Sequence, residues 1–260
     1  MKFCRFVPLD ASPATSPLYG LLEGDEIQEV TGIPWGQWSR ASRTWPRAKT
    51  RLLAPVDPGK VICVGRNYAA HAAELGNEVP KEPLLFLKPS SSIVGSDEPV
   101  LLPVYSKRVE YEGELAAVVG RRCSHLGDSE DPLSYLFGYT CLNDVTARDL
   151  QKSDVQFTRA KGFDTFCPVG PHIETQLNPA DVLVETRVNG AVRQSGSTSL
   201  MIYPVAHLVR HISRMMTLLP GDVIATGTPA GVGPLVAGDV VEVSVAGVGV
   251  LRNPVQASRA

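Results

Sequence analysis

Short strand-like runs separated by turn-forming residues fill most of this chain, and this pattern restricts the folds open to it. Four of the turn signals are Gly127-Asp128, Asn189-Gly190, Pro220-Gly221-Asp222 and Gly238-Asp239. Only two segments, about 149–158 and 204–216, have the pattern of longer helices. Many short strands with few helices favour a sandwich or a rolled barrel over alternating α/β. We therefore expect a mainly β chain of the α+β class.

The first 58 residues differ from the rest of the chain. A hairpin pattern turns at Glu23-Gly24-Asp25, and all three Trp residues follow among several prolines. We predict that residues 1–58 form a small β-rich N-terminal module with a proline-rich linker. The apolar run 61–64, which ends at Gly65, predicts a buried strand at the start of the main domain, which we place at residues 59–260.

Length, charge and cysteine content exclude several classes of protein. The 260 residues carry a formal net charge of −2, and no basic stripe indicates a nucleic-acid partner. No apolar run approaches the ~18 residues that a membrane span needs. The five cysteines are widely spaced without a C-x-x-C pair, which is typical of reduced thiols. We expect a cytoplasmic protein that binds neither nucleic acid nor a membrane.

Alternating glutamates precede the most apolar strand of the chain. Residues two apart in a strand face the same side, so Glu110, Glu112 and Glu114 are expected to share one face. Such alternation usually indicates a solvated face. Here residues 115–119 are apolar on both faces, so the strand is expected to carry Glu112 and Glu114 toward the core. Buried carboxylates need a cation or a proton, and oxygen ligands suit a hard ion such as Mg²⁺, Mn²⁺ or Ca²⁺.

A second acidic segment contains Asp144, Arg148 and Gln151. If a helix begins nearby, these residues lie on one face at i, i+4 and i+7. An acid, a cation and an amide on one edge suit an anionic ligand that chelates a metal, and they suit a plain ion pair equally. Capping of the helix by Asn143 or Asp144 is a further alternative.

Two further segments carry groups for acid–base chemistry. His71 and Glu74 are three residues apart on a predicted short helix, and a carboxylate that accepts a hydrogen bond from imidazole raises its basicity. The pair is therefore a candidate general base, or else an exposed pair. Lys161, among aromatic residues, is a candidate clamp for a carboxylate or else a surface lysine. The Gly/Pro-rich loop 224–234 lacks the sequence of a phosphate loop, but its N–H groups suit a carboxylate.

Six motifs, in this order, resemble the fumarylacetoacetate hydrolase family over roughly residues 60–254. They are GRNYAAHAAELG, FLKPSSSIVG, EYEGELAAVVG, GYTCLNDVTARDLQ, KGFDTFCPVGP and LLPGDVIATGTPAGVGP. The resemblance implies a mixed β-sandwich roll that usually assembles as a homodimer. The N-terminal module is similar to that of bacterial members named as isomerases or hydrolases.

The resemblance also implies roles for individual residues. One Mg²⁺ or Mn²⁺ ion per chain is expected on Glu112, Glu114 and Asp144. The implied catalytic residues are His71, Glu74 and Lys161, and the implied substrate contacts are Arg148, Gln151 and Thr228.

The implied reaction is cleavage of the C–C bond of an acylpyruvate-type 2,4-dioxo acid through a pyruvate enolate that the metal stabilises. His71, oriented by Glu74, would deprotonate the attacking water, and Lys161 would stabilise the developing negative charge. We therefore predict a metal-dependent C–C hydrolase.

Other reactions pass through the same enolate and remain alternatives. They are isomerisation of 2-hydroxyhepta-2,4-diene-1,7-dioate and decarboxylation or tautomerisation of oxaloacetate. A non-catalytic, metal-dependent binding module and a purely structural β protein are alternatives from other classes.

Overall fold

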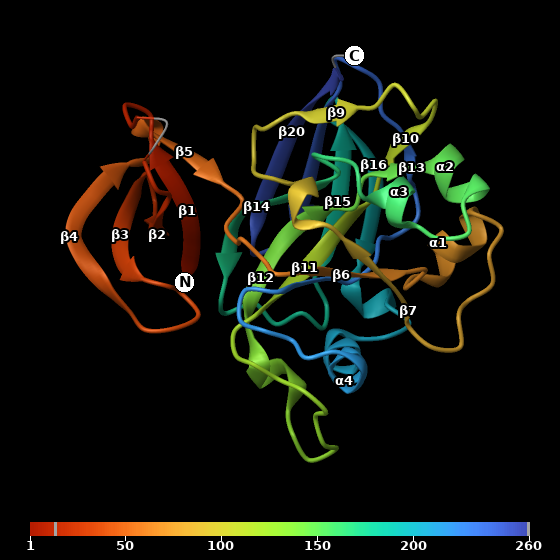
Figure 1. Ribbon diagram of the computed structural model, residues 1–260, viewed down its shortest axis with the longest axis horizontal. Coiled ribbons are helices and arrows are strands. Elements are labelled where there is room, and N and C mark those ends of the chain that lie inside the picture. The colour runs from red at the N-terminus through yellow and green to blue at the C-terminus, as the bar shows by residue number, and fades with distance from the viewer. Residues whose placement is uncertain (13–14, 259–260) are drawn as a thin grey trace.

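A meander of short strands forms the N-terminal part of the structure, a computed structural model that describes residues 1–12 and 15–258 (Figure 1). Its elements are β1 (Lys2–Pro8), β2 (Leu18–Glu23), β3 (Glu26–Gly32), β4 (Trp38–Pro46), the 3-10 turn η1 (Arg47–Lys49) and β5 (Thr50–Leu53). The predicted hairpin is confirmed, because Glu23 pairs with Glu26 across the β2–β3 turn.

Two of the Trp residues, Trp38 and Trp45, lie in residues 38–46 of the N-terminal module. This segment is β4, which pairs with β3, because its aromatic side chains have partners in the module. The ring of Trp38 lies 5.1 Å from that of Phe3, and the ring of Trp45 lies 6.0 Å from that of Phe6. Such edge-to-face pairs stabilise a small sheet beyond the area that they bury.

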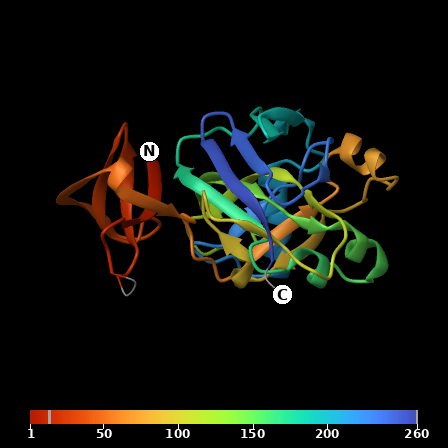
Figure 2. The ribbon, with the colours of Figure 1, turned by 90° about the horizontal axis from the view of Figure 1, so that it is seen from above.

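The N-terminal module lies to one side of the main domain, as Figures 1 and 2 show from two directions. Strand β1 nevertheless continues the central sheet, because Lys2 and Phe3 pair with Glu174 and Ile173 of β14 (Cys167–Glu174).

The main domain is built on one long mixed sheet. From β14 its order is β14-β12-β11-β17-β6-β7, and β8 pairs with β14. The bounds are β6 (Val61–Gly65), β7 (Leu84–Lys88), β8 (Ile93–Val94), β11 (Gly113–Val119), β12 (Leu136–Asn143) and β17 (Val223–Ala225). Strand β11 is buried along its whole length, as its double-sided apolar sequence predicts.

A second sheet packs on the first, with the order β16-β15-β19-β20-β9. Its strands are β9 (Val100–Leu102), β15 (Leu183–Val188), β16 (Ala191–Ser197), β19 (Val240–Val245) and β20 (Gly249–Ala257). The apolar core between the sheets includes Leu115, Cys141, Val184 and Val243. The sheets approach closely at Gly113, where a Cβ atom would lie 2.0 Å from Thr186 Oγ1. Only glycine fits at this position. Because the sheets pack tightly here, the neighbouring residues Glu112 and Glu114 are held in place.

A small third sheet, β13-β10-β18, lies at the N-terminal end of β11, where Glu112 and Glu114 are located. Its strands are β10 (Val109–Tyr111), β13 (Thr146–Ala147) and β18 (Gly233–Pro234). It brings the residues before β11, the residues after β12 and the Gly/Pro-rich loop together, because Glu110 pairs with both Thr146 and Pro234.

The helices are few and short, and the mainly β, α+β prediction is confirmed. They are α1 (Ala69–Glu74), α2 (Arg148–Ser153), α3 (Thr158–Lys161) and α4 (Val205–Met215), with 3-10 turns η2 (Ser90–Ser92), η3 (Pro132–Tyr135) and η4 (Thr198–Leu200). The helix predicted at 204–216 is α4, which buries Leu208, Val209 and Ile212. Among the described helices, none has both the length and the apolar character needed to cross a membrane.

The single helix predicted at 149–158 is wrong, because α2 ends at Ser153 and α3 begins at Thr158. Asp154 adopts an extended conformation, and its carboxylate accepts hydrogen bonds from Arg159 at 2.6 and 2.8 Å. Val155 is 93% exposed, so no packing favours a continuous helix here.

Candidate active site

Three carboxylates from neighbouring strands converge at the edge of the long sheet. Glu112 and Glu114 flank Gly113 at the start of β11, and Asp144 follows β12, whose Asn143 pairs with Gly113. A ligand oxygen of each carboxylate lies within 4.8 Å of those of the other two. All three side chains are buried. Carboxylate oxygens arranged in this way are suited to hold a hard divalent cation.

Backbone contacts hold this carboxylate cluster in place. The N–H of Glu112 donates to Asn143 Oδ1 at 2.9 Å, and the N–H of Asp144 donates to the Glu112 carbonyl at 2.8 Å. The N–H of Gly227 donates to Glu114 Oε2 at 2.7 Å. Backbone groups at the strand ends and in the Gly/Pro-rich loop thus fix the three acids.

Glu110 lies apart from the cluster although it belongs to the same alternating sequence. Its two oxygens accept hydrogen bonds from Arg108 at 2.5 Å and from Arg148 at 2.6 Å. Glu110 therefore orients Arg148, which also binds Glu112.

Buried cations surround the carboxylates. The Lys161 ammonium donates to Glu112 Oε2 at 2.8 Å and to Asp144 Oδ2 at 2.6 Å. Lys88, which sequence reasoning missed, donates to Asp144 Oδ1 at 2.6 Å and is 1% exposed. The signal for it is a lysine at the end of an apolar strand, within the motif FLKPSSSIVG.

The electrostatic surroundings of Glu112 and Glu114 shift the pKa values of the two carboxyls in opposite directions. Burial alone would raise the pKa of Glu112, but Lys161 and Arg148 outweigh burial and hold that pKa well below its usual range. Burial, followed by the charges of Asp144 and Glu112, raises the pKa of Glu114 well above its usual value. Within the described residues, Glu114 has no ion-pair partner. A buried carboxylate in this state needs a proton or an added cation, so the residues present fit a bound divalent ion.

Asp144 does not lie on the helix that the spacing suggested. It precedes β13, and α2 begins at Arg148 with Ala147 as its N-cap, so neither Asn143 nor Asp144 caps the helix through its side chain. The predicted i, i+4, i+7 face is therefore wrong. Arg148 and Gln151 do share an edge of α2, because Arg148 donates to Gln151 Oε1 at 2.6 Å.

The predicted dyad on α1 forms, with a long contact. His71 Nδ1 lies 3.4 Å from Glu74 Oε2, and the Glu74 carboxylate also accepts the N–H of Gly231 at 3.0 and 3.1 Å. Glu74 thus connects α1 to the Gly/Pro-rich loop. His71 is buried at the pocket, whereas the Glu74 side chain is 32% exposed.

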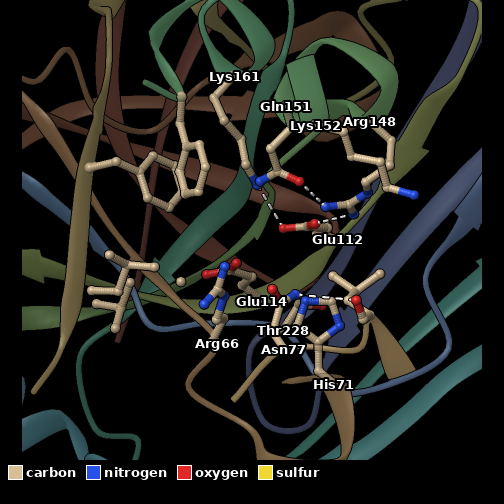
Figure 3. Close-up of a pocket in the computed structure, with 16 residues that line it drawn as sticks. Arg66, His71, Asn77, Glu112, Glu114, Arg148, Gln151, Lys152, Lys161 and Thr228 are labelled. Carbon is tan, nitrogen blue, oxygen red and sulfur yellow. Dashed lines mark hydrogen bonds and ion pairs between the residues drawn. The ribbon is translucent and has the colours of Figure 1, made fainter. Parts of the chain in front are cut away.

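A cavity of about 220 Å³ opens above the carboxylates. Its polar lining is His71, Glu112, Glu114, Arg148, Gln151, Lys161 and Thr228, together with Arg66, Asn77 and Lys152. In Figure 3, Lys161, Gln151 and Arg148 enter from one side, and His71 and Thr228 lie on the other. Seven of the nine residues assigned to the site therefore line one pocket, and the other two contact lining residues: Asp144 binds Lys161, and Glu74 lies beside His71.

The hydroxyl of Thr228 is already engaged by the protein. It donates to the Gly113 carbonyl at 2.8 Å and accepts from Gln194 Nε2 at 2.7 Å. Gln194 also accepts the N–H of Gly113 at 3.0 Å. Sequence reasoning missed Gln194, whose position on β16 gives no local signal of a role in the site.

A known protein family matches the part of the chain that forms this site. The family described as "Fumarylacetoacetate (FAA) hydrolase C-terminal" matches residues 60–256, which contain every residue of the pocket and the carboxylate cluster. The chain belongs to the fumarylacetoacetate hydrolase family. The first part of this family member, residues 1–55, matches a second family, "Rv2993c-like, N-terminal".

Relatives of this fumarylacetoacetate hydrolase family member carry several names. Protein Rv2993c of Mycobacterium tuberculosis is 51% identical over 231 residues, 88% of this chain and 87% of that protein. Oxaloacetate tautomerase FAHD2A, mitochondrial, of Homo sapiens is 42% identical over 223 residues, 81% of this chain and 71% of that protein. The crystal structure of 5-carboxymethyl-2-hydroxymuconate delta-isomerase from Mycobacterium smegmatis is 46% identical with a TM-score of 0.89, and covers 99% of this chain and 100% of that one.

Proposed function

We propose that this protein is a divalent-metal-dependent enzyme that interconverts keto and enol forms, or double-bond isomers, of a small 2-oxo acid. One observation carries the proposal: the buried carboxylates of Glu112, Glu114 and Asp144 converge within 4.8 Å, and Glu112 and Glu114 line a pocket together with Lys161. A strong negative cluster beside a positive side chain suits a substrate that chelates a cation and develops negative charge during reaction.

The carboxylate cluster would hold one Mg²⁺ or Mn²⁺ ion through oxygen ligands. The bound ion would supply Lewis-acid stabilisation of the charge that develops on the 2-oxo group. Glu114, the carboxylate without an ion-pair partner among the described residues, supplies the charge that this ion would balance.

Lys161 brings a second positive charge to the same place. Burial alone would lower its pKa, but Asp144 and Glu112 outweigh burial and raise it, so the side chain stays an ammonium. An ammonium held by two carboxylates is fixed in position before the substrate arrives, which is the arrangement that makes electrostatic stabilisation effective.

His71 is the group of the pocket suited to move a proton. With Nδ1–H directed at Glu74, the free ring nitrogen is the basic Nε2. In the keto-to-enol direction this nitrogen takes the proton from C3 of the substrate, and the resulting imidazolium delivers that proton to the 2-oxo oxygen. In the reverse direction it takes the enol proton from that oxygen and delivers it to C3.

The names of the relatives favour the tautomerase or isomerase reaction over hydrolysis. Proteins 42% and 46% identical are named as an oxaloacetate tautomerase and as a muconate isomerase. The C–C hydrolase that the sequence predicts remains a second candidate, and the His71–Glu74 dyad favours it because hydrolysis needs an activated water. Decarboxylation of oxaloacetate needs the same stabilisation of negative charge without that water.

The experiment is a substrate panel with Mg²⁺ or Mn²⁺ and after exhaustive chelation. We expect the metal to accelerate the disappearance of enol-oxaloacetate. The ultraviolet absorbance of the enol measures this rate. Faster cleavage of an acylpyruvate to pyruvate and a carboxylic acid would replace the proposal with the hydrolase. A lack of metal-dependent turnover with every member of the panel would refute both.

We also propose, from the family alone, that the protein is a homodimer formed through the main domain. Light scattering at micromolar concentration should give the mass of a dimer, and a monomer mass would refute this.

A further inference from the structure

Arg66 is a cation of the pocket that the proposed chemistry does not use. It follows β6 directly, is half-buried and lines the same cavity as the carboxylate cluster. Across residues 1–12 and 15–258, the Arg66 guanidinium has no hydrogen-bond or ion-pair partner. A sheltered guanidinium without an anion is unusual, because its five donors are then only partly solvated.

The other buried cations beside the pocket are already paired. Lys161 binds Glu112 and Asp144, and Arg148 binds Glu110, Glu112 and Gln151. In Figure 3, Arg66 lies on the side of Glu114, across the pocket from Lys161 and Arg148. Arg66 therefore offers its charge on the opposite wall of the pocket from Lys161 and Arg148.

The backbone at Arg66 is held in an unfavourable conformation. Its φ is +57°, a left-handed value that glycine adopts freely and residues with a Cβ avoid. The next residue fixes it there: Asn67 Nδ2 donates to the Thr226 carbonyl at 2.7 Å, and Asn67 Oδ1 accepts the N–H of Tyr203 at 2.8 Å. Such strain persists where the surroundings impose it and is concentrated at functional sites.

We propose that Arg66 binds a second carboxylate, at the end of the substrate opposite its 2-oxo acid group, and so selects 2-oxo dicarboxylates over monocarboxylates. The planar guanidinium matches a carboxylate through two parallel hydrogen bonds. The substrates in the names of the two relatives, oxaloacetate and 5-carboxymethyl-2-hydroxymuconate, both carry such a second carboxylate. The inference rests on the proposed function, because it assumes that the carboxylate cluster binds the 2-oxo end.

Binding of unreactive probes tests the inference without turnover. L-malate and its 4-methyl ester share a chelating 2-hydroxy acid and differ only in the distal carboxylate. Calorimetry with Mg²⁺-loaded wild type should show roughly 10- to 100-fold tighter binding of the diacid, as expected for a charged hydrogen bond. Arg66→Gln should remove this preference and leave the affinity for the ester within about 2-fold. Arg66→Lys should keep part of this preference, because lysine retains the positive charge but cannot form the two parallel hydrogen bonds of a guanidinium.

Three further variants sharpen the result. Arg66→Gly suits the left-handed backbone, so it should fold at least as stably as wild type while losing the preference. Two control variants should keep the preference. Lys152→Gln removes an exposed cation of the same pocket, and Arg122→Gln removes an exposed cation outside it. Equal wild-type affinity for diacid and ester, or a preference that Lys152→Gln abolishes and Arg66→Gln keeps, would overturn the inference.

Turnover separates the inference from the proposed function. Arg66→Gln should raise the KM for oxaloacetate and leave that for its 4-methyl ester unchanged. Equal KM changes for both substrates would overturn the inference and keep the function. A wild type that turns over neither substrate but binds malate through Arg66 would overturn the function and keep the inference.

Discussion

The Lys161 ammonium donates a 2.6 Å hydrogen bond to Asp144, one of the carboxylates that we propose as metal ligands. It therefore competes for oxygen lone pairs that a divalent cation would use. We expect Lys161→Met to bind Mn²⁺ at least as tightly as wild type in calorimetry, while kcat falls on the order of 10²–10³-fold, as for the loss of one group that stabilises developing charge. Weaker Mn²⁺ binding would mean that Lys161 organises the ligands, and unchanged kcat would remove it from the mechanism.

His71 distinguishes the reactions open to this site. Hydrolysis of an acylpyruvate needs an activated water, so His71→Ala should lose most of that rate, typically ~10²–10⁴-fold for a general base. Oxaloacetate decarboxylation depends chiefly on stabilised negative charge, so the same change should cost it less. The measurement is kcat for both substrates at saturating Mg²⁺. Full hydrolase activity in the variant would exclude His71 from the hydrolysis mechanism. Equal losses of kcat for both substrates would indicate that His71 acts in protonation or in closing the site.

A buried histidine outside the site should make the fold sensitive to acid. Burial, and then the charge of Lys2, lowers the pKa of His172 to about 4 from 6.5. The unfolded chain therefore binds more protons than the folded one in this window, so stability is complete above pH 6.5 and is lost as pH falls toward 4. Because a tenfold change in proton affinity corresponds to about 1.4 kcal/mol, His172 alone should lower the free energy of unfolding by about 3 kcal/mol between pH 7 and pH 4.

The check is urea unfolding of wild type and His172→Gln at both pH values. The difference between the two proteins isolates His172 from the carboxylates that titrate in the same range. We expect the variant to lose less stability on acidification than wild type, and equal losses would contradict the assignment.

Local patterns predicted the main parts of this site because the information in them is local. The apolar run after the glutamates was enough to predict that Glu112 and Glu114 are buried, although the chain here forms two strands, β10 and β11, rather than one. The contact of Lys88 with Asp144 could not be predicted in this way, because the two residues meet only after β6 and β7 join the sheet beside β17. Gln194 reaches Gly113 only through the packing of the two sheets.

The errors have the same origin. No local pattern predicted β4, because the partners of Trp38 and Trp45, Phe3 and Phe6, lie far away in sequence on β1. Asp144 looked like a helical residue because the spacing to Arg148 fits a helix, whereas pairing of β13 with β10 keeps the chain extended until Ala147. Tertiary pairing overrides local spacing in both places.

The central claim is that Glu112, Glu114 and Asp144 bind one divalent cation, and calorimetric titration with Mn²⁺ tests it most directly. Wild type should bind one ion per chain. Glu114→Gln should weaken binding by more than the 10–100-fold typical for loss of an outer partner of a metal ligand. Glu110→Gln is the matched control from the same alternating sequence and should stay within a few-fold of wild type, because Arg108 and Arg148 occupy its carboxylate. Normal Mn²⁺ binding by Glu114→Gln together with loss of binding by Glu110→Gln would contradict the account.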